Sequence, residues 1–198
     1  MRFADLDLNK VYTYADYFKW KFEERVELLK GKIYKMSPAP NRAHQTLAGY
    51  IYIELGVFLR KKECKVYVAP FDVRLPRKSK EDKDIITVLQ PDVCVVCDAS
   101  KLDKRGCIGA PDIVVEVLSP GNNAKELKNK FEIYEEAGVK EYWLVSPQDQ
   151  TFIQNTLVDG KYHPSRLMTT GDIVTSPILP GFSLDLTGLF DTGIADGE

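Results

Sequence analysis

The sequence is short of several features that would each indicate a particular class of protein. Its 4 cysteines are too few and too scattered for a disulfide scaffold in a chain of 198 residues. No segment approaches the roughly 18 consecutive apolar residues of a membrane-spanning helix, and the N-terminus lacks the apolar stretch of a signal peptide. These absences predict a protein of the reducing cytoplasm with no membrane partner.

A linker and a strong net charge are also missing. No stretch rich in glycine, serine or proline divides the chain, so we expect residues 1–198 to form a single domain. The net charge of −2 gives no general basic surface for nucleic acid. Basic residues cluster at 60–62, 74–83 and 101–105, but runs of this kind are usually solvated loops.

Hydrophobic periodicity and turn residues predict alternating helices and strands. Helices are expected over 14–24, 41–62 and 124–137, with Thr13 and Gly138 as capping residues. Strands are expected over 26–29, 32–36, 65–75, 88–97, 111–119, 141–146 and 151–157. Pro91 interrupts the 88–97 strand early, which suggests a bulge or strand entry there. The segments 77–84 and 101–110 are expected to be loops, and the tail is expected to add short strands at a sheet edge.

One acidic residue lies where an acid is rarely found. Glu116 stands within the β-branched run 111–119, which is typical of a strand buried on both faces of a sheet. A buried carboxylate loses its hydration, so it must be paired, protonated or bound to a metal. Strand alternation places Asp112, Val114 and Glu116 on one face. A buried salt bridge and a functional carboxylate both remain open.

The helix expected over 124–137 holds a second residue of this kind. Glu126 and Lys130 lie one turn apart within its apolar half, so Lys130 is the lysine of this helix that points toward the sheet. It either pairs with Glu126 on a partly exposed flank, or it brings an ammonium to the face that carries Glu116.

A third acid, Asp92, follows Pro91 and opens the apolar run 93–97. If that strand neighbours the strand of Glu116, the two carboxylates can converge on one divalent cation. Mg²⁺ prefers hard oxygen ligands, commonly carboxylates, waters and substrate phosphates. An ammonium beside such a metal suits the hydrolysis of a phosphodiester.

Three other features have both a structural and a functional interpretation. Cys94 and Cys97 have the spacing of a zinc knuckle, but their thiols point to opposite faces of an extended strand, which favours buried structural cysteines. His44 is aligned with Leu47 on an apolar helix face, so it is either a core histidine or a functional one. The segment 119–123 either caps the following helix or binds an anion there.

The sequence resembles the Uma family of restriction endonuclease-like proteins, within the PD-(D/E)XK nuclease superfamily. The resemblance is carried by Pro91–Asp92, by the strand that holds Glu116 and by the sheet-facing Lys130. The order and spacing of the matching stretches are specific, although each stretch alone is not. The resemblance implies an α/β fold of the mixed α+β kind, restriction-endonuclease-like, with a central mixed sheet flanked by helices. The matching stretches cover nearly the whole chain: 27–38, 44–45, 90–93, 109–120, 130–134, 138–145 and 179–182.

Carried over by position, the resemblance assigns roles to five residues. Asp92 and Glu116 are the expected metal ligands for Mg²⁺ or Mn²⁺, and Lys130 is the expected catalytic lysine. Glu27 matches a further acid that helps to hold a metal, and His44 lies near the same cleft.

The chain departs from the family pattern at two positions. The superfamily lysine normally stands two residues after the acid, where this chain has Leu118, so its role must pass to Lys130. The family commonly has aspartate at the position of Ser146.

The sequence therefore predicts a Mg²⁺-dependent endonuclease that hydrolyses DNA phosphodiester bonds, with a homodimer as one form it can take. The first alternative is a non-catalytic module on the same fold that binds nucleic acid or protein. The second is a scaffold in which Glu116 and Lys130 form a buried ion pair. Metal dependence distinguishes these hypotheses.

Overall fold

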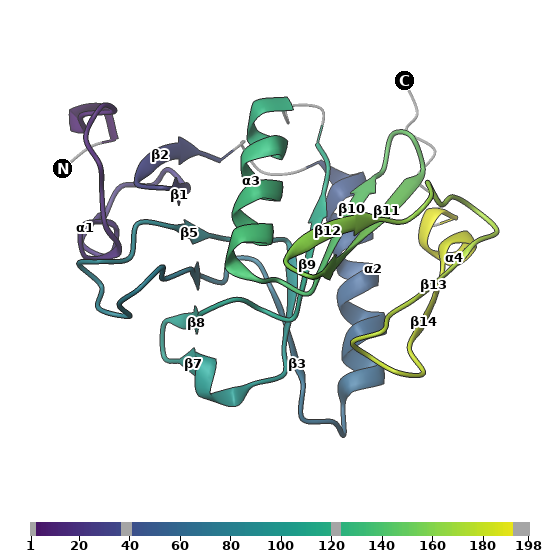
Figure 1. Cartoon of the computed structure of the whole chain (residues 1–198). Coiled ribbons are helices and arrows are strands. Elements are labelled where there is room, and N and C mark those ends of the chain that lie inside the picture. Colours follow the sequence, from purple (N-terminus) through teal and green to yellow (C-terminus); the bar gives the residue numbers. More distant parts are fainter. Residues whose placement is uncertain (1–2, 37–40, 120–123, 192–198) are drawn as a thin grey trace.

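The strands form two mixed sheets and a separate hairpin in the computed structural model, which describes residues 3–36, 41–119 and 124–191 (Figure 1). The first, here the β9 sheet, has the order β12 (Lys161–Pro164), β11 (Thr151–Val158), β10 (Glu141–Ser146), β9 (Ile113–Val117), β6 (Val93–Val96) and β3 (Lys65–Val68). The second, here the β1 sheet, has the order β2 (Lys32–Lys35), β1 (Val26–Leu29), β5 (Val88–Leu89), β4 (Val73–Arg74), β8 (Gly106–Ile108) and β7 (Leu102–Asp103). The hairpin consists of β13 (Ile173–Thr175) and β14 (Ser183–Asp185).

Two long helices cover the opposite faces of the β9 sheet, in which β9 and β10 are parallel and the other neighbours antiparallel (Figure 1). α2 (Arg42–Leu59) packs on the face that carries Val115, and α3 (Ala124–Ala137) packs on the face that carries Val114. Burial on both faces explains the almost continuous β-branched run of β9. The fold predicted from the sequence, a mixed sheet flanked by helices, is confirmed.

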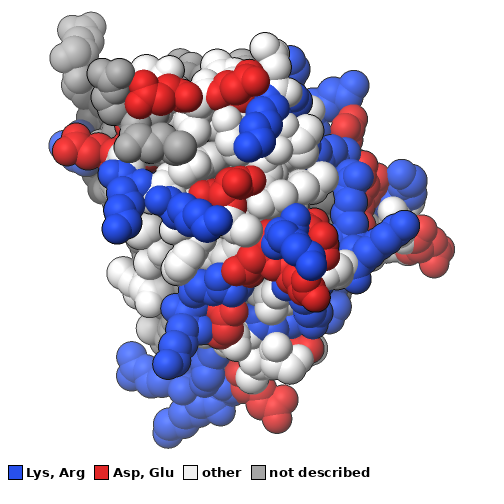
Figure 2. All heavy atoms as spheres, turned by 90° about the vertical axis from the view of Figure 1, so that its left-hand side faces the viewer, with Lys and Arg blue, Asp and Glu red and all other residues white. Residues whose placement is uncertain are grey.

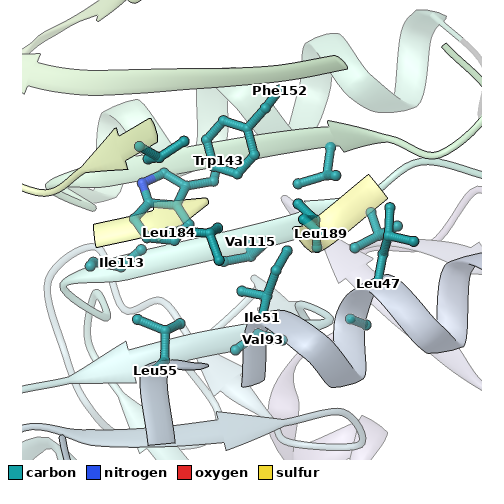
Figure 3. Packing of buried hydrophobic residues seen from close by; sticks show 14 of the residues in the cluster. Leu47, Ile51, Leu55, Val93, Ile113, Val115, Trp143, Phe152, Leu184 and Leu189 are labelled. Carbon is teal, nitrogen blue, oxygen red and sulfur yellow. The ribbon is translucent and has the colours of Figure 1, made fainter. Parts of the chain in front are cut away.

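The core on the α2 side is the larger one, and Figure 3 shows its packing. Leu47, Ile51 and Leu55 recur along one face of α2 and meet Val93 and Val115 of the sheet. Trp143 of β10 is fully buried in the same cluster. The hairpin and α4 (Leu186–Phe190) close this core, and α4 was not predicted from the sequence.

Several elements lie where local sequence patterns predicted them. Residues 30–31 form the turn of the β1–β2 hairpin, with φ of 51° at Lys30 and 81° at Gly31, the positive values that a two-residue turn requires. The α3 helix has the predicted bounds, and Gly138 follows it with a φ of 84°. Asn41 caps α2 by accepting a hydrogen bond from the backbone N–H of His44 at 2.9 Å.

The first predicted helix is wrong in length. Thr13 caps it as expected, but α1 (Tyr14–Tyr17) spans four residues rather than the predicted 14–24. Beyond it, Trp20 packs against the rings of Tyr12 and Phe22, so tertiary packing of aromatic side chains ends the helix early.

Two strand predictions and one loop prediction also need correction. The predicted strand 65–75 is divided into β3 and β4 around Pro70, and the predicted strand 88–97 is divided into β5 and β6 around Pro91, because proline cannot donate to the strand ladder. In both cases the two halves belong to different sheets. The predicted loop 101–110 instead contains β7 and β8, and η2 (Ala99–Lys101) ends at its first residue.

The prediction that Cys97 is a buried structural cysteine is wrong, because Cys64 and Cys97 form a disulfide with an S–S distance of 2.07 Å. The antiparallel pairing of β3 with β6 sets Lys65 opposite Val96, so the next residues outward are these two cysteines. Cys94 and Cys107 are buried free thiols, as expected of structural cysteines. The two cysteines are 33 residues apart in the sequence, so no local sequence pattern indicated the bond.

None of the helices within the described ranges is long and apolar enough to cross a bilayer. The residues 120–123 of the possible anion-binding segment lie outside the described residues, as does the 37–40 stretch.

Candidate active site

The pairing of β6 with β9 brings two of the predicted acids to the same edge of the β9 sheet. These strands are antiparallel, with Val93 opposite Val115, so Asp92 and Glu116 are the next pair in the register. The backbone N–H of Val117, the neighbour of Glu116, donates to Oδ2 of Asp92 at 2.8 Å. The two strands are therefore neighbours, as the metal hypothesis requires.

Glu116 lies in the middle of an ionic and hydrogen-bonded network. Its residue is 8% exposed, and Lys130 Nζ lies 3.1 Å from both of its carboxylate oxygens. The phenol of Tyr134 donates to Oε1 at 2.8 Å. Both partners come from successive turns of α3, which packs directly over this face of the sheet.

Lys130 is shared between two carboxylates from different sheets. Its ammonium lies 3.2 Å from Oε2 of Glu27 in β1, in addition to its contact with Glu116. The other oxygen of Glu27, Oε1, accepts a hydrogen bond from the backbone N–H of Gln90 at 2.8 Å. Lys130 is buried, so the partly exposed pairing with Glu126 that the sequence left open does not describe its environment.

His44 holds Asp92 from the opposite side. It lies in the first turn of α2, below the Asn41 cap, and its Nε2 atom is 3.1 Å from Oδ2 of Asp92. Its Nδ1 atom is buried and has no hydrogen-bond partner among the described groups. His44 is therefore not a fully satisfied core histidine.

The pKa values of this network follow from its burial and its charges. Burial raises the pKa of Glu116 to about 7, the Lys130 ammonium opposes this rise, and the charges of Asp92 and Glu27 add to it. Burial lowers the pKa of Lys130, but the carboxylates of Glu116 and Glu27 outweigh it and raise the value above the ordinary one. Burial also raises the pKa of Tyr134 well above its ordinary value, so its phenol keeps its proton.

All five residues singled out in the sequence thus lie in one connected group. Glu27, Glu116 and Lys130 form its ionic centre, and Asp92 with His44 adjoins them at the edge of β9. Sequence reasoning missed Tyr134, although its position four residues after Lys130 on the same helix face was a usable signal.

Other candidates lie apart from this group or have structural partners. Cys97 is bonded to Cys64, which excludes a zinc knuckle with Cys94 in this form of the protein. The hydroxyl of Ser146, at the position where aspartate was expected, donates to Asp149 at 2.7 Å. Within the described parts of the chain, no three His, Cys, Asp or Glu side chains are arranged to hold a metal ion.

Comparisons with known proteins agree with this fold. The solved structure described as a putative nuclease belonging to DUF820 from Anabaena variabilis ATCC 29413 has a similar fold, with a TM-score of 0.70 and 18% sequence identity. The match covers 90% of this chain and 97% of that one. No curated protein matches the chain. The model of the Uma2 family, described as "Putative restriction endonuclease", matches residues 14–187. The chain therefore belongs to the Uma2 family of restriction endonuclease-like proteins.

Proposed function

We propose that the protein is a metal-dependent endonuclease that hydrolyses DNA phosphodiester bonds. The observation that carries the proposal is the convergence of Glu116, Glu27 and Lys130 with the Asp92–His44 pair at one edge of the β9 sheet. Family membership supports the reaction class, because the Uma2 description names a restriction endonuclease.

The donor atoms fit Mg²⁺ or Mn²⁺. Asp92 and Glu116 offer hard carboxylate oxygens, and sites for Mg²⁺ commonly use one or two carboxylates with waters and substrate phosphates as the remaining ligands. Val117 and His44 both contact Oδ2 of Asp92, so Oδ1 has neither of these contacts. The charge of Asp92 contributes to the raised pKa of Glu116, and a cation relieves such repulsion.

Asp92 and Glu116 would hold the metal, which when bound would supply an activated water and stabilisation of the charge on the phosphate. The Lys130 ammonium, held between Glu116 and Glu27, turns toward the phosphate and stabilises the negative charge that grows there. Glu27 keeps the lysine charged and close to the site. His44 fixes the orientation of Asp92 through Oδ2.

The proposed substrate is DNA, although the protein has a net charge of −2. Figure 2 shows a face on which Lys and Arg side chains are interspersed with Asp and Glu and gather most densely toward the bottom. A protein with this charge pattern must hold DNA through local cations near the site rather than through a broad basic surface.

One observation favours a second candidate, a non-catalytic module on the same fold. Lys130 contacts both Glu116 and Glu27, so each of these acids already has a cationic partner without a metal. In that case the acids serve only as structural partners, and neither metal nor nuclease activity is needed.

Cleavage of supercoiled plasmid with Mg²⁺, with Mn²⁺ and with a chelator separates the two candidates. We expect the wild type to produce nicked and linear DNA only with a metal, and Glu116→Gln and Asp92→Asn to produce neither. Glu132→Gln serves as the matched control, because Glu132 lies on α3 and its side chain is 45% exposed. No cleavage by the wild type, or equal cleavage by Glu116→Gln, would contradict the proposal.

A further inference from the structure

The phenol of Tyr134 contacts the central carboxylate of the site without belonging to the expected catalytic set. Tyr134 is fully buried, and its hydroxyl donates to Oε1 of Glu116 at 2.8 Å. It follows Lys130 by four residues, so one turn of α3 brings an ammonium and a phenol to the same carboxylate.

The two oxygens of Glu116 are held differently. Oε1 accepts from both Tyr134 and Lys130, whereas Oε2 contacts Lys130. Lys130 is also bound to Glu27, and in the proposed reaction its ammonium turns to the phosphate. Tyr134 is the neutral donor that stays on Glu116 when this happens.

We propose that Tyr134 is a positioning residue that fixes Glu116 through Oε1 and so presents Oε2 to the metal. The proposal rests on the proposed nuclease function, because it concerns the same metal site. An uncharged donor suits this task, since it orients a carboxylate without opposing the charge of an incoming cation. Groups that orient metal ligands in this way typically change metal affinity by about 10–100-fold when they are removed.

Tyr142 of β10 supplies a matched control. It is fully buried like Tyr134, and the two ring centroids are 5.0 Å apart. The hydroxyl of Tyr142 has no hydrogen-bond partner among the described groups. Tyrosine to phenylalanine removes the same atom at both positions, but only at Tyr134 does it remove a contact with Glu116.

The test compares wild type, Tyr134→Phe and Tyr142→Phe as full-length proteins. Mn²⁺ affinity is measured by titration calorimetry, and plasmid cleavage is measured as a function of Mn²⁺ concentration. We expect Tyr134→Phe to bind Mn²⁺ about 10–100-fold more weakly and to need correspondingly more Mn²⁺ for cleavage. We expect Tyr142→Phe to stay within about twofold of wild type in both measurements, because its hydroxyl orients no ligand.

Each other outcome contradicts the positioning role of Tyr134, and one of them also contradicts the proposed nuclease function. If the wild type binds and cleaves but Tyr134→Phe matches it in Mn²⁺ affinity, the positioning role is wrong and the nuclease proposal stands. Equal losses in Tyr134→Phe and Tyr142→Phe, with lowered melting temperatures in both, indicate a packing effect and also overturn the positioning role. A wild type that neither binds Mn²⁺ nor cleaves overturns both proposals.

Discussion

Single substitutions at Lys130 or at its two carboxylate partners directly change the charge balance of the buried site. The ammonium lies within 3.2 Å of carboxylate oxygens from both Glu116 and Glu27, and all three residues are buried. Removing one partner of a buried ion pair is costly because it leaves an uncompensated charge. The lysine therefore has a structural role in the metal-free protein, whatever its part in the reaction.

Lys130→Met should separate these two roles. The substitution keeps the packing of the stem and deletes the charge, so we expect the metal-free variant to lose roughly 3–5 kcal/mol of unfolding free energy. We expect Mn²⁺ to raise its melting temperature more than that of wild type, because the cation replaces the missing positive charge. Plasmid cleavage should be lost.

The control for this prediction is Lys128→Met on the same helix. The side chain of Lys128 is 77% exposed, so the change should alter unfolding free energy by less than about 0.5 kcal/mol. Equal stability of the two variants in urea unfolding would show that Lys130 balances no buried charge.

A pH dependence follows from Glu116. Because its folded pKa is raised from 4.5 to about 7, the folded state favours the protonated carboxyl. The resulting stability is present in full below pH 4.5 and is lost as the pH rises through about 7. Without metal, the unfolding free energy of wild type should therefore fall relative to that of Glu116→Gln over this range. Urea unfolding at several pH values measures the difference, and parallel curves would contradict the prediction.

At the scale of single elements, what the sequence could predict depended on whether the signal was local. The bounds of α3 and the turn between β1 and β2 follow from short-range periodicity and turn residues, and both predictions are confirmed. The strand around Pro70 was predicted as continuous because its apolar pattern runs on. Pro91 was predicted to interrupt its strand only as a bulge or strand entry, but in both cases the halves pair with strands in different sheets. Such pairing depends on partners that are distant in the sequence, so propensity alone could not reveal it.

The first turn of α2 carries an element-scale prediction, because it positions His44. Asn41→Ala removes the side chain that accepts the His44 N–H, so we expect a loss of about 1 kcal/mol in unfolding free energy. Asn41→Ser retains a capping oxygen and should lose much less. Urea unfolding compares the variants, and equal losses would mean that the cap is not the cause.

At the scale of the whole molecule, the site depends on contacts between distant segments. Glu27 reaches Lys130 across 103 positions of sequence and from a different sheet, and only the assembled fold brings them together. The sequence showed Asp92, Glu116 and Lys130 as charged residues on apolar faces, whereas Glu27 was expected only from the family resemblance. The distances among these residues could not be predicted. The disulfide between Cys64 and Cys97 was missed for the same reason, since it follows from the pairing of β3 with β6.

The whole fold also places exposed cations around the site. Arg42 begins α2 two residues before His44, and Lys125 lies in the first turn of α3, the helix that carries Lys130. Both cations are exposed. DNA held at the proposed site should therefore contact these cations with its phosphates.

Charge reversal tests this placement on the inactive Glu116→Gln background, where DNA is bound but not cut. We expect the double change Arg42→Glu and Lys125→Glu to weaken the binding of a short duplex and to reduce its salt dependence by up to about 2 in slope, since each lost phosphate contact contributes about 0.9. The control reverses Arg60 and Lys61, which follow α2 at its far end, about 27 Å from Arg42 by the rise of an 18-residue helix. Fluorescence anisotropy at several salt concentrations measures both variants. If the control loses as much affinity as the variant with Arg42→Glu and Lys125→Glu, the DNA binds elsewhere on the molecule. A duplex centred on the proposed site is not expected to contact that end of α2.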